Sequence, residues 1–87
     1  MQLPDVNLGD CWEQGDSRRI VARLSEDGGV EYALYRRFRI WVRRNYTTPE
    51  RTEYTDVFRW TWLFSRHGLS TAEQWQRWQR TAKQIEP

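Results

Sequence analysis

The sequence predicts a small, mainly β protein in which about four antiparallel strands form a strongly curled sheet or barrel, capped by one C-terminal α-helix. The chain has 87 residues, which suits one domain, so we take residues 1–87 as a single unit. Apolar and polar residues alternate with a period of two over most of residues 18–64, and this alternation is typical of strands. The period lengthens to 3.6 after Gly68, which favours a helix at the C-terminal end.

Turn-forming residues divide the alternating part of the chain. They are found at Gly15-Asp16-Ser17, at Asp27-Gly28-Gly29, at residues 45–51 and at His67-Gly68. Four strands are therefore predicted, at residues 11–14, 18–25, 30–44 and 52–64. In the second strand, one side carries Ile20, Ala22 and Leu24, and the other carries Arg19, Val21 and Arg23.

The third strand, residues 30–44, is the longest alternating run. A helix competes with it, because Leu34, Phe38, Trp41 and Val42 would also share one helical face. β-branched and aromatic residues dominate the run and a hairpin-type turn precedes it, so we favour a strand, with a bulge near Arg36. Its even positions are then the apolar side, and its odd positions carry most of the arginines.

The fourth strand, residues 52–64, is the most aromatic segment of the chain. One of its faces carries Tyr54, Phe58, Trp60, Trp62 and Phe64. A flat sheet would leave these rings without cover, so we expect the sheet to curl around them into a small barrel.

A helix is predicted over residues 70–84, beginning at the capping sequence Ser70-Thr71-Ala72-Glu73. The residues expected to pack on the sheet are Ala72, Trp75, Trp78, Ala82 and Ile85. On its solvated side, Arg77, Arg80 and Lys83 form a secondary basic group.

Several short patterns resemble small SH3-like barrel proteins of tailed bacteriophages and prophages. They are Leu8-Gly9-Asp10-x-Trp12, Arg18-Arg19-Ile20-Val21, Val30-x-Tyr32 and the helical pair Trp75-Gln76-Arg77-Trp78. The resemblance implies an SH3-like barrel and a compact, non-enzymatic phage or prophage product, and it implies no active site.

Few residues of this chain could perform catalysis or bind a metal. With one Cys and one His, a four-ligand zinc site is not expected, and a Cys11–His67 nucleophilic pair is formally possible, although a half-buried Cys in the first strand and a His in a turn explain both residues. No nucleotide-binding or hydrolase motif occurs. We therefore expect no enzyme activity, cofactor, metal or small-molecule substrate. No apolar run is long enough to span a bilayer and the first nine residues do not form a signal peptide, so we expect a cytoplasmic protein and no membrane partner.

Basic charge is concentrated in the third strand. Residues 32–49 carry five arginines and no acidic residue, whereas residues 1–31 carry three arginines and seven acidic residues. The odd positions of the third strand combine arginines with aromatic rings, and we predict them as the binding residues: Tyr35, Arg37, Arg39, Trp41 and Arg43.

This arginine and aromatic face is open to three interpretations. Guanidinium groups match phosphates and rings stack on bases, so the face could bind nucleic acid or a nucleoprotein complex. Arg and Trp are also enriched at protein interfaces, so the alternative is a module that inhibits a host factor, as anti-CRISPR proteins do. The third interpretation is a merely solvated face, because the chain has 13 Arg and one Lys, an excess that a GC-rich genome would also produce.

Overall fold

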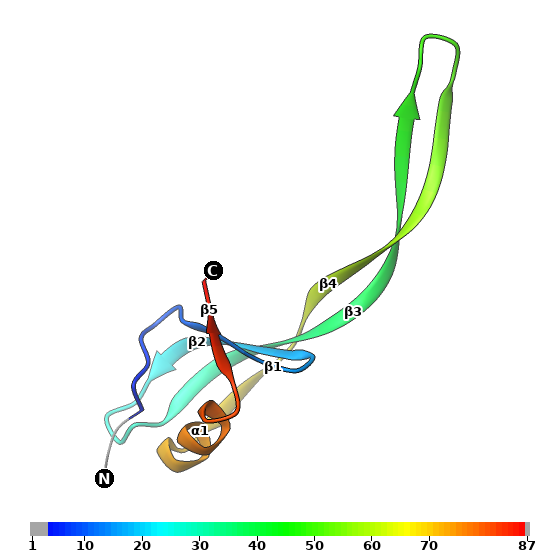
Figure 1. Cartoon of the computed structure of the whole chain (residues 1–87). Coiled ribbons are helices and arrows are strands. Elements are labelled where there is room, and N and C mark those ends of the chain that lie inside the picture. Colours follow the sequence, from blue (N-terminus) through cyan, green and yellow to red (C-terminus); the bar gives the residue numbers. More distant parts are fainter. Residues whose placement is uncertain (1–3, 87) are drawn as a thin grey trace.

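The computed structural model describes residues 4–86, which form an open antiparallel sheet of five strands and one helix (Figure 1). The strands are β1 (Cys11–Gln14), β2 (Ser17–Leu24), β3 (Val30–Thr47), β4 (Thr52–Ser70) and β5 (Lys83–Ile85), and the helix α1 spans Ala72–Gln79. The order of strands across the sheet is β4-β3-β2-β1-β5. The end of the sheet where all five strands lie side by side is called the body below.

The hairpin of β3 and β4 continues far beyond the body. β2 pairs with β3 only as far as Ser17 and Arg36, whereas β3 and β4 remain paired to Thr47 and Thr52. Residues 37–63 thus form a two-stranded ribbon, called the arm, which twists away from the body in Figure 1. The molecule measures 67 × 20 × 19 Å and its radius of gyration is 18.5 Å. A compact domain of this length would have a radius of gyration of about 12 Å.

The hydrophobic core lies between α1 and one face of the body. Trp75 of α1 is fully buried, and its ring centroid lies 5.8 Å from that of Tyr32. The other buried members of the cluster are Val6, Val21, Val30 and Leu34, and Trp12 and Trp78 pack against them. Two rings one turn apart, Trp75 buried and Trp78 half-buried, give this eight-residue helix the tertiary contacts that its length requires.

Arg19 extends into the edge of this core. Its guanidinium carbon lies 4.4 Å from the ring centroid of Tyr32 and 4.1 Å from that of Trp78. Burial lowers the pKa of Arg19, but an arginine remains charged at neutral pH. Its positive charge is therefore stabilised mainly by the faces of aromatic rings.

The predicted barrel is wrong, because the sheet stays open. The eight residues of β2 and the four of β1 are too short to flank β3 and β4 along their whole length. The long strands pair only with each other over the arm, so no neighbouring strand is present there to close a barrel. The SH3-like barrel implied by the resemblance is not observed either.

The more apolar side of β2, with Ile20, Ala22 and Leu24, is not the side that the helix covers. In β2, Val21 is buried and Arg19 is half-buried while Ala22 and Leu24 are exposed, because Val21 pairs with Tyr32 on the side that α1 covers. The paired position then shifts at Ala22, which has no partner in β3.

The predicted helix over residues 70–84 is shorter than expected. Thr71, rather than Ser70, is the N-cap, and its side chain and that of Gln74 form a reciprocal capping box. The helix ends at Gln79, because the chain turns and β5 pairs with β1, with Ile85 opposite Cys11. This fifth strand was not predicted.

The core predicts a large difference between two substitutions. Trp75→Ala should reduce the free energy of unfolding by roughly 3–5 kcal/mol, because it removes a fully buried ring. Leu69→Ala is the control, since Leu69 is 71% exposed, and it should change the free energy by less than about 0.5 kcal/mol. Urea unfolding followed by circular dichroism measures both. Equal effects would contradict the placement of α1.

Candidate functional site

The pairing of β3 with β4 changes by one residue at the base of the arm. In the body Leu34 is opposite Arg66, and one step further Tyr35 is opposite Phe64, so Ser65 is an unpaired bulge in β4. Because side chains alternate between the two faces of a strand, this extra residue exchanges the faces of β4 relative to β3 along the whole arm. Odd residues of β3 then share a face with even residues of β4.

The arginines of β3 and the aromatic rings of β4 consequently lie on the same face, called the arginine–aromatic face. From β3 it contains Tyr35, Arg37, Arg39, Trp41 and Arg43, and from β4 it contains Tyr54, Phe58, Trp60, Trp62 and Phe64. The five predicted binding residues are thus on one face, as expected for alternate positions of a strand. The β4 rings were expected in the core, and their presence here is a correction. The short loop between Thr47 and Thr52 could have indicated this placement from the sequence. It sets an odd residue of β3 opposite an even residue of β4, so the β4 rings share a face with the β3 arginines.

Guanidinium groups and rings stack on each other along this face. Arg37 lies 4.3 Å from the ring centroid of Trp60, and Arg39 lies 4.3 Å from that of Phe58. The ring of Trp41 contacts that of Phe58 at a centroid distance of 3.5 Å. Stacking fixes each guanidinium by its flat side and leaves its N–H edges free to donate hydrogen bonds.

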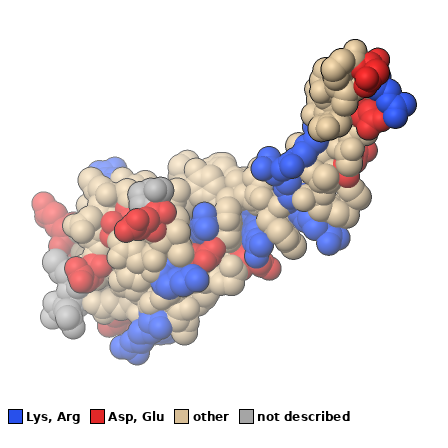
Figure 2. All heavy atoms as spheres, turned by 45° about the horizontal axis from the view of Figure 1, so that its top comes forward, with Lys and Arg blue, Asp and Glu red and all other residues tan. Residues whose placement is uncertain are grey.

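The arginines of this face differ in their acidic partners. Arg43 forms an ion pair of 3.4 Å with Asp56, near the tip. Arg37 and Arg39 are exposed and form no ion pair with any residue in the described part of the chain. Figure 2 shows basic side chains spaced along the arm, with acidic ones near its tip. The middle of the arm therefore offers two unpaired positive charges.

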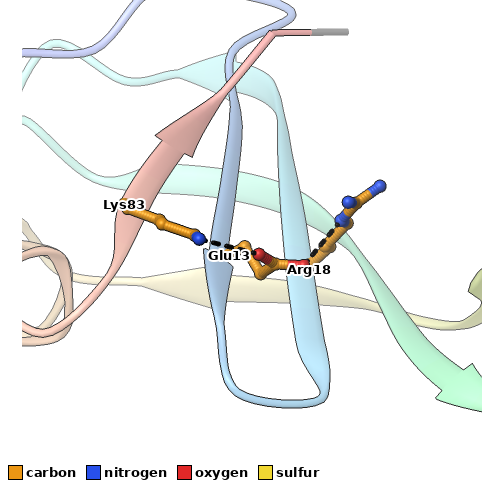
Figure 3. A network of polar contacts seen from close by, with 3 residues as sticks. All are labelled: Glu13, Arg18 and Lys83. Atoms are coloured by element: carbon orange, nitrogen blue, oxygen red, sulfur yellow. Dashed lines mark hydrogen bonds and ion pairs between the residues drawn. The ribbon is translucent and has the colours of Figure 1, made fainter.

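The same face continues onto the body. Arg18 of β2 lies 4.2 Å from the ring centroid of Trp62, so it extends the series of stacked arginines. Glu13 of β1 holds Arg18 by an ion pair of 3.2 Å and contacts Lys83 of β5 at 3.8 Å (Figure 3). Glu13 partly neutralises this end of the face.

The secondary basic residues are not brought together as predicted. Lys83 lies in β5 rather than in the helix, and its ammonium group contacts Glu13. Arg77 lies in the last turn of α1 and Arg80 follows it as the C-cap. Since α1 covers the opposite face of the sheet, these two arginines are separate from the arginine–aromatic face.

Cys11 and His67 do not form a nucleophilic pair. They lie in one row across the sheet, with Ile20 and Ala33 between them. Three strand spacings correspond to about 14 Å, far beyond hydrogen-bond distance. Cys11 is buried, and burial raises the pKa of its thiol, although the nearby Arg18 opposes the shift.

The described residues contain neither a metal-binding cluster nor a helix that could span a membrane. Within residues 4–86, no three His, Cys, Asp or Glu side chains form a group that could hold a metal ion. No helix among these residues has the length and the hydropathy that crossing a bilayer requires.

Comparison with known proteins gives no relative for this chain. No protein-family model matches it, and no curated protein or solved structure matches it significantly.

The arm geometry predicts which tryptophans are open to water. Trp41 is 63% exposed and Trp60 is also exposed, whereas Trp75 is fully buried. Replacing Trp41 and Trp60 by Phe should remove much of the tryptophan fluorescence that acrylamide quenches. Trp75→Phe should instead remove fluorescence that acrylamide does not quench, because Trp75 is shielded from solvent. Stern–Volmer measurements on the purified chain test this. Shielded emission from Trp41 and Trp60 would show that the arm is covered or folded differently.

Proposed function

We propose that this chain is a non-enzymatic module that binds nucleic acid through the arginine–aromatic face of its arm. One observation carries the proposal: Arg37 and Arg39 are exposed, stacked on rings and without an acidic partner among residues 4–86. A guanidinium held in this way can donate two parallel hydrogen bonds to a phosphate. The phage or prophage origin expected from the sequence stays a prediction.

The spacing of the arginines supports a phosphate-binding role. Alternate residues of a strand are about 6.8 Å apart, which is twice the ~3.4 Å axial spacing of phosphates on one strand of a duplex. Arg37 and Arg39 are separated by one such step, and Arg43 lies two further steps along the arm. Their side chains can therefore follow a phosphate backbone.

Trp41 supplies a surface on which a base could stack. One side of its ring contacts Phe58, and the residue is largely exposed to water. Stacking of a base on an aromatic side chain is worth about 1–3 kcal/mol and tolerates any sequence. This residue favours single-stranded nucleic acid as the ligand.

The shape of the arm is compatible with a duplex as well. A two-stranded ribbon fits into the major groove of B-DNA, which is about 12 Å wide. The arm has no third strand beside it from Arg37 to Thr47, so the body does not obstruct its approach. Single-stranded and duplex ligands share the same phosphate chemistry, and the experiment below separates them.

Binding should depend on salt through the two unpaired arginines. In fluorescence anisotropy titrations with labelled DNA and RNA, Arg37→Gln with Arg39→Gln should reduce the slope of log K against log salt by roughly 1.5. Trp41→Ala should weaken single-strand binding by roughly 1–3 kcal/mol and leave duplex binding nearly unchanged.

A matched control removes the same charge elsewhere. Arg77→Gln with Arg80→Gln also lowers the net charge by two, but these residues lie outside the face, so the slope should stay at its wild-type value. An equal loss in both double variants would mean that only net charge matters. If the wild-type chain shows no salt-sensitive binding to any nucleic acid, the proposal fails and the protein-partner alternative, inhibition of a host factor, takes its place.

A further inference from the structure

The opposite face of the arm is apolar and also lacks cover. The even residues of β3 and the odd residues of β4 form this aliphatic face, which contains Phe38, Ile40, Val42, Val57 and Leu63, with Tyr46 at the tip. α1 does not reach it, because the helix packs on the body against Tyr32. Both faces of the arm are thus open to water, and they differ in chemistry.

The exposure of the aliphatic face is large for a ribbon of only two strands. Phe38 is 47% exposed and Leu63 is 45% exposed, and they lie on neighbouring strands. An isolated two-stranded ribbon is marginally stable in water, and contiguous apolar patches usually mark a surface that another molecule covers. Unlike the other face, this one has no guanidinium stacked on a ring among the described residues.

Positive charges surround the apolar residues. Arg36 lies at the base of the aliphatic face, Arg59 beside Ile40, and Arg44 towards the tip. None of the three forms an ion pair within residues 4–86. Glu53, the acidic residue at the tip of this face, is already paired with Arg51 at 2.6 Å. The face therefore lacks the negative charges that its own arginines would require.

We propose that the aliphatic face binds an acidic amphipathic helix of a protein partner. A helix with side chains is about 10 Å across and covers two strands, and about 18 helical residues span the ~27 Å from Arg36 to Arg44. Its apolar side packs on Phe38, Ile40 and Leu63. Glutamates beside that stripe pair with Arg36, Arg44 and Arg59.

Charge argues against a second copy of this chain as the occupant. Two aliphatic faces packed together would bring six unpaired arginines into one interface, three from each copy. Glu53 of each copy is already paired with Arg51 of the same copy and would not neutralise them. Like charges in contact across an interface are strongly unfavourable. An acidic partner relieves the repulsion that self-association would create.

The partner helix leaves the arginine–aromatic face open, so both surfaces can be occupied at once.

The test uses synthetic peptides of about 18 residues with a leucine stripe. One peptide carries glutamates beside the stripe, and the other carries lysines at the same positions. The full-length chain should bind the labelled glutamate peptide at least about tenfold more tightly than the lysine peptide in anisotropy titrations. Phe38→Thr with Leu63→Thr should lose that binding by at least about tenfold, since threonine retains strand propensity. Circular dichroism confirms that the variant is folded.

Matched variants separate this inference from nucleic-acid binding. Arg36→Gln with Arg44→Gln should weaken the glutamate peptide and reduce its salt dependence, whereas Arg37→Gln with Arg39→Gln should leave the peptide unaffected. If both pairs weaken it equally, or if neither peptide binds, the inference is overturned. It is also overturned if sedimentation velocity shows a dimer that Phe38→Thr dissociates, or if only anionic lipid vesicles bind the aliphatic face.

Discussion

The pairing of β3 with β4 over a length that no other strand matches is the constraint from which the rest of the molecule follows. Eighteen and nineteen residues pair in one hairpin, while β2 accompanies them for eight residues and β1 is shorter still. A ribbon without a third strand or a covering layer has two faces in water. Stacking an arginine on a ring gives about 0.5–1 kcal/mol at an exposed site, and cross-strand pairs give similar amounts. The arm has no hydrophobic core of its own, and several such contacts along its length stabilise it.

The same contact has different consequences in the body and in the arm. Around Arg19 the rings of Tyr32, Trp75 and Trp78 lie close to the guanidinium, so its charge is partly withdrawn from water and serves packing. Along the arm the guanidinium and the ring stack side by side and both stay exposed, as Arg37 and Trp60 do. There the charged edge faces outward and remains available to a ligand. Arg19 lies among three rings and Arg37 against one, and this difference separates a structural arginine from one that can bind.

Local patterns in the sequence predict what depends on neighbouring residues. Alternation with a period of two located β2 to β4, although β3 and β4 extend to Thr47 and Ser70, beyond the predicted ends. Alternation also placed the arginines of β3 on one side, because alternate residues of a strand share a face wherever the strand lies. Local patterns could not predict whether the sheet closes into a barrel, which side of β2 faces α1, or the presence of β5. Each depends on which strands meet and in which register, and distant residues such as Cys11 and Ile85 determine that.

The most consequential of these long-range features is one residue, Ser65. Without this bulge the pairing seen in the body would continue along the arm, and even residues of both strands would share a face. The rings of Phe58, Trp60 and Trp62 would then join Phe38 and Ile40 in one large apolar face, and the arginines of the other face would lie opposite aliphatic and hydroxyl side chains. That arrangement is the one the alternation alone predicts, and it would need a barrel or a partner to cover it. With the bulge, the rings lie on the same face as the arginines. A single unpaired residue at the base of the arm thus joins the pairing of the body to the different pairing that the Thr47–Thr52 connection sets in the arm, and it also adds to the twist by which the arm leaves the body.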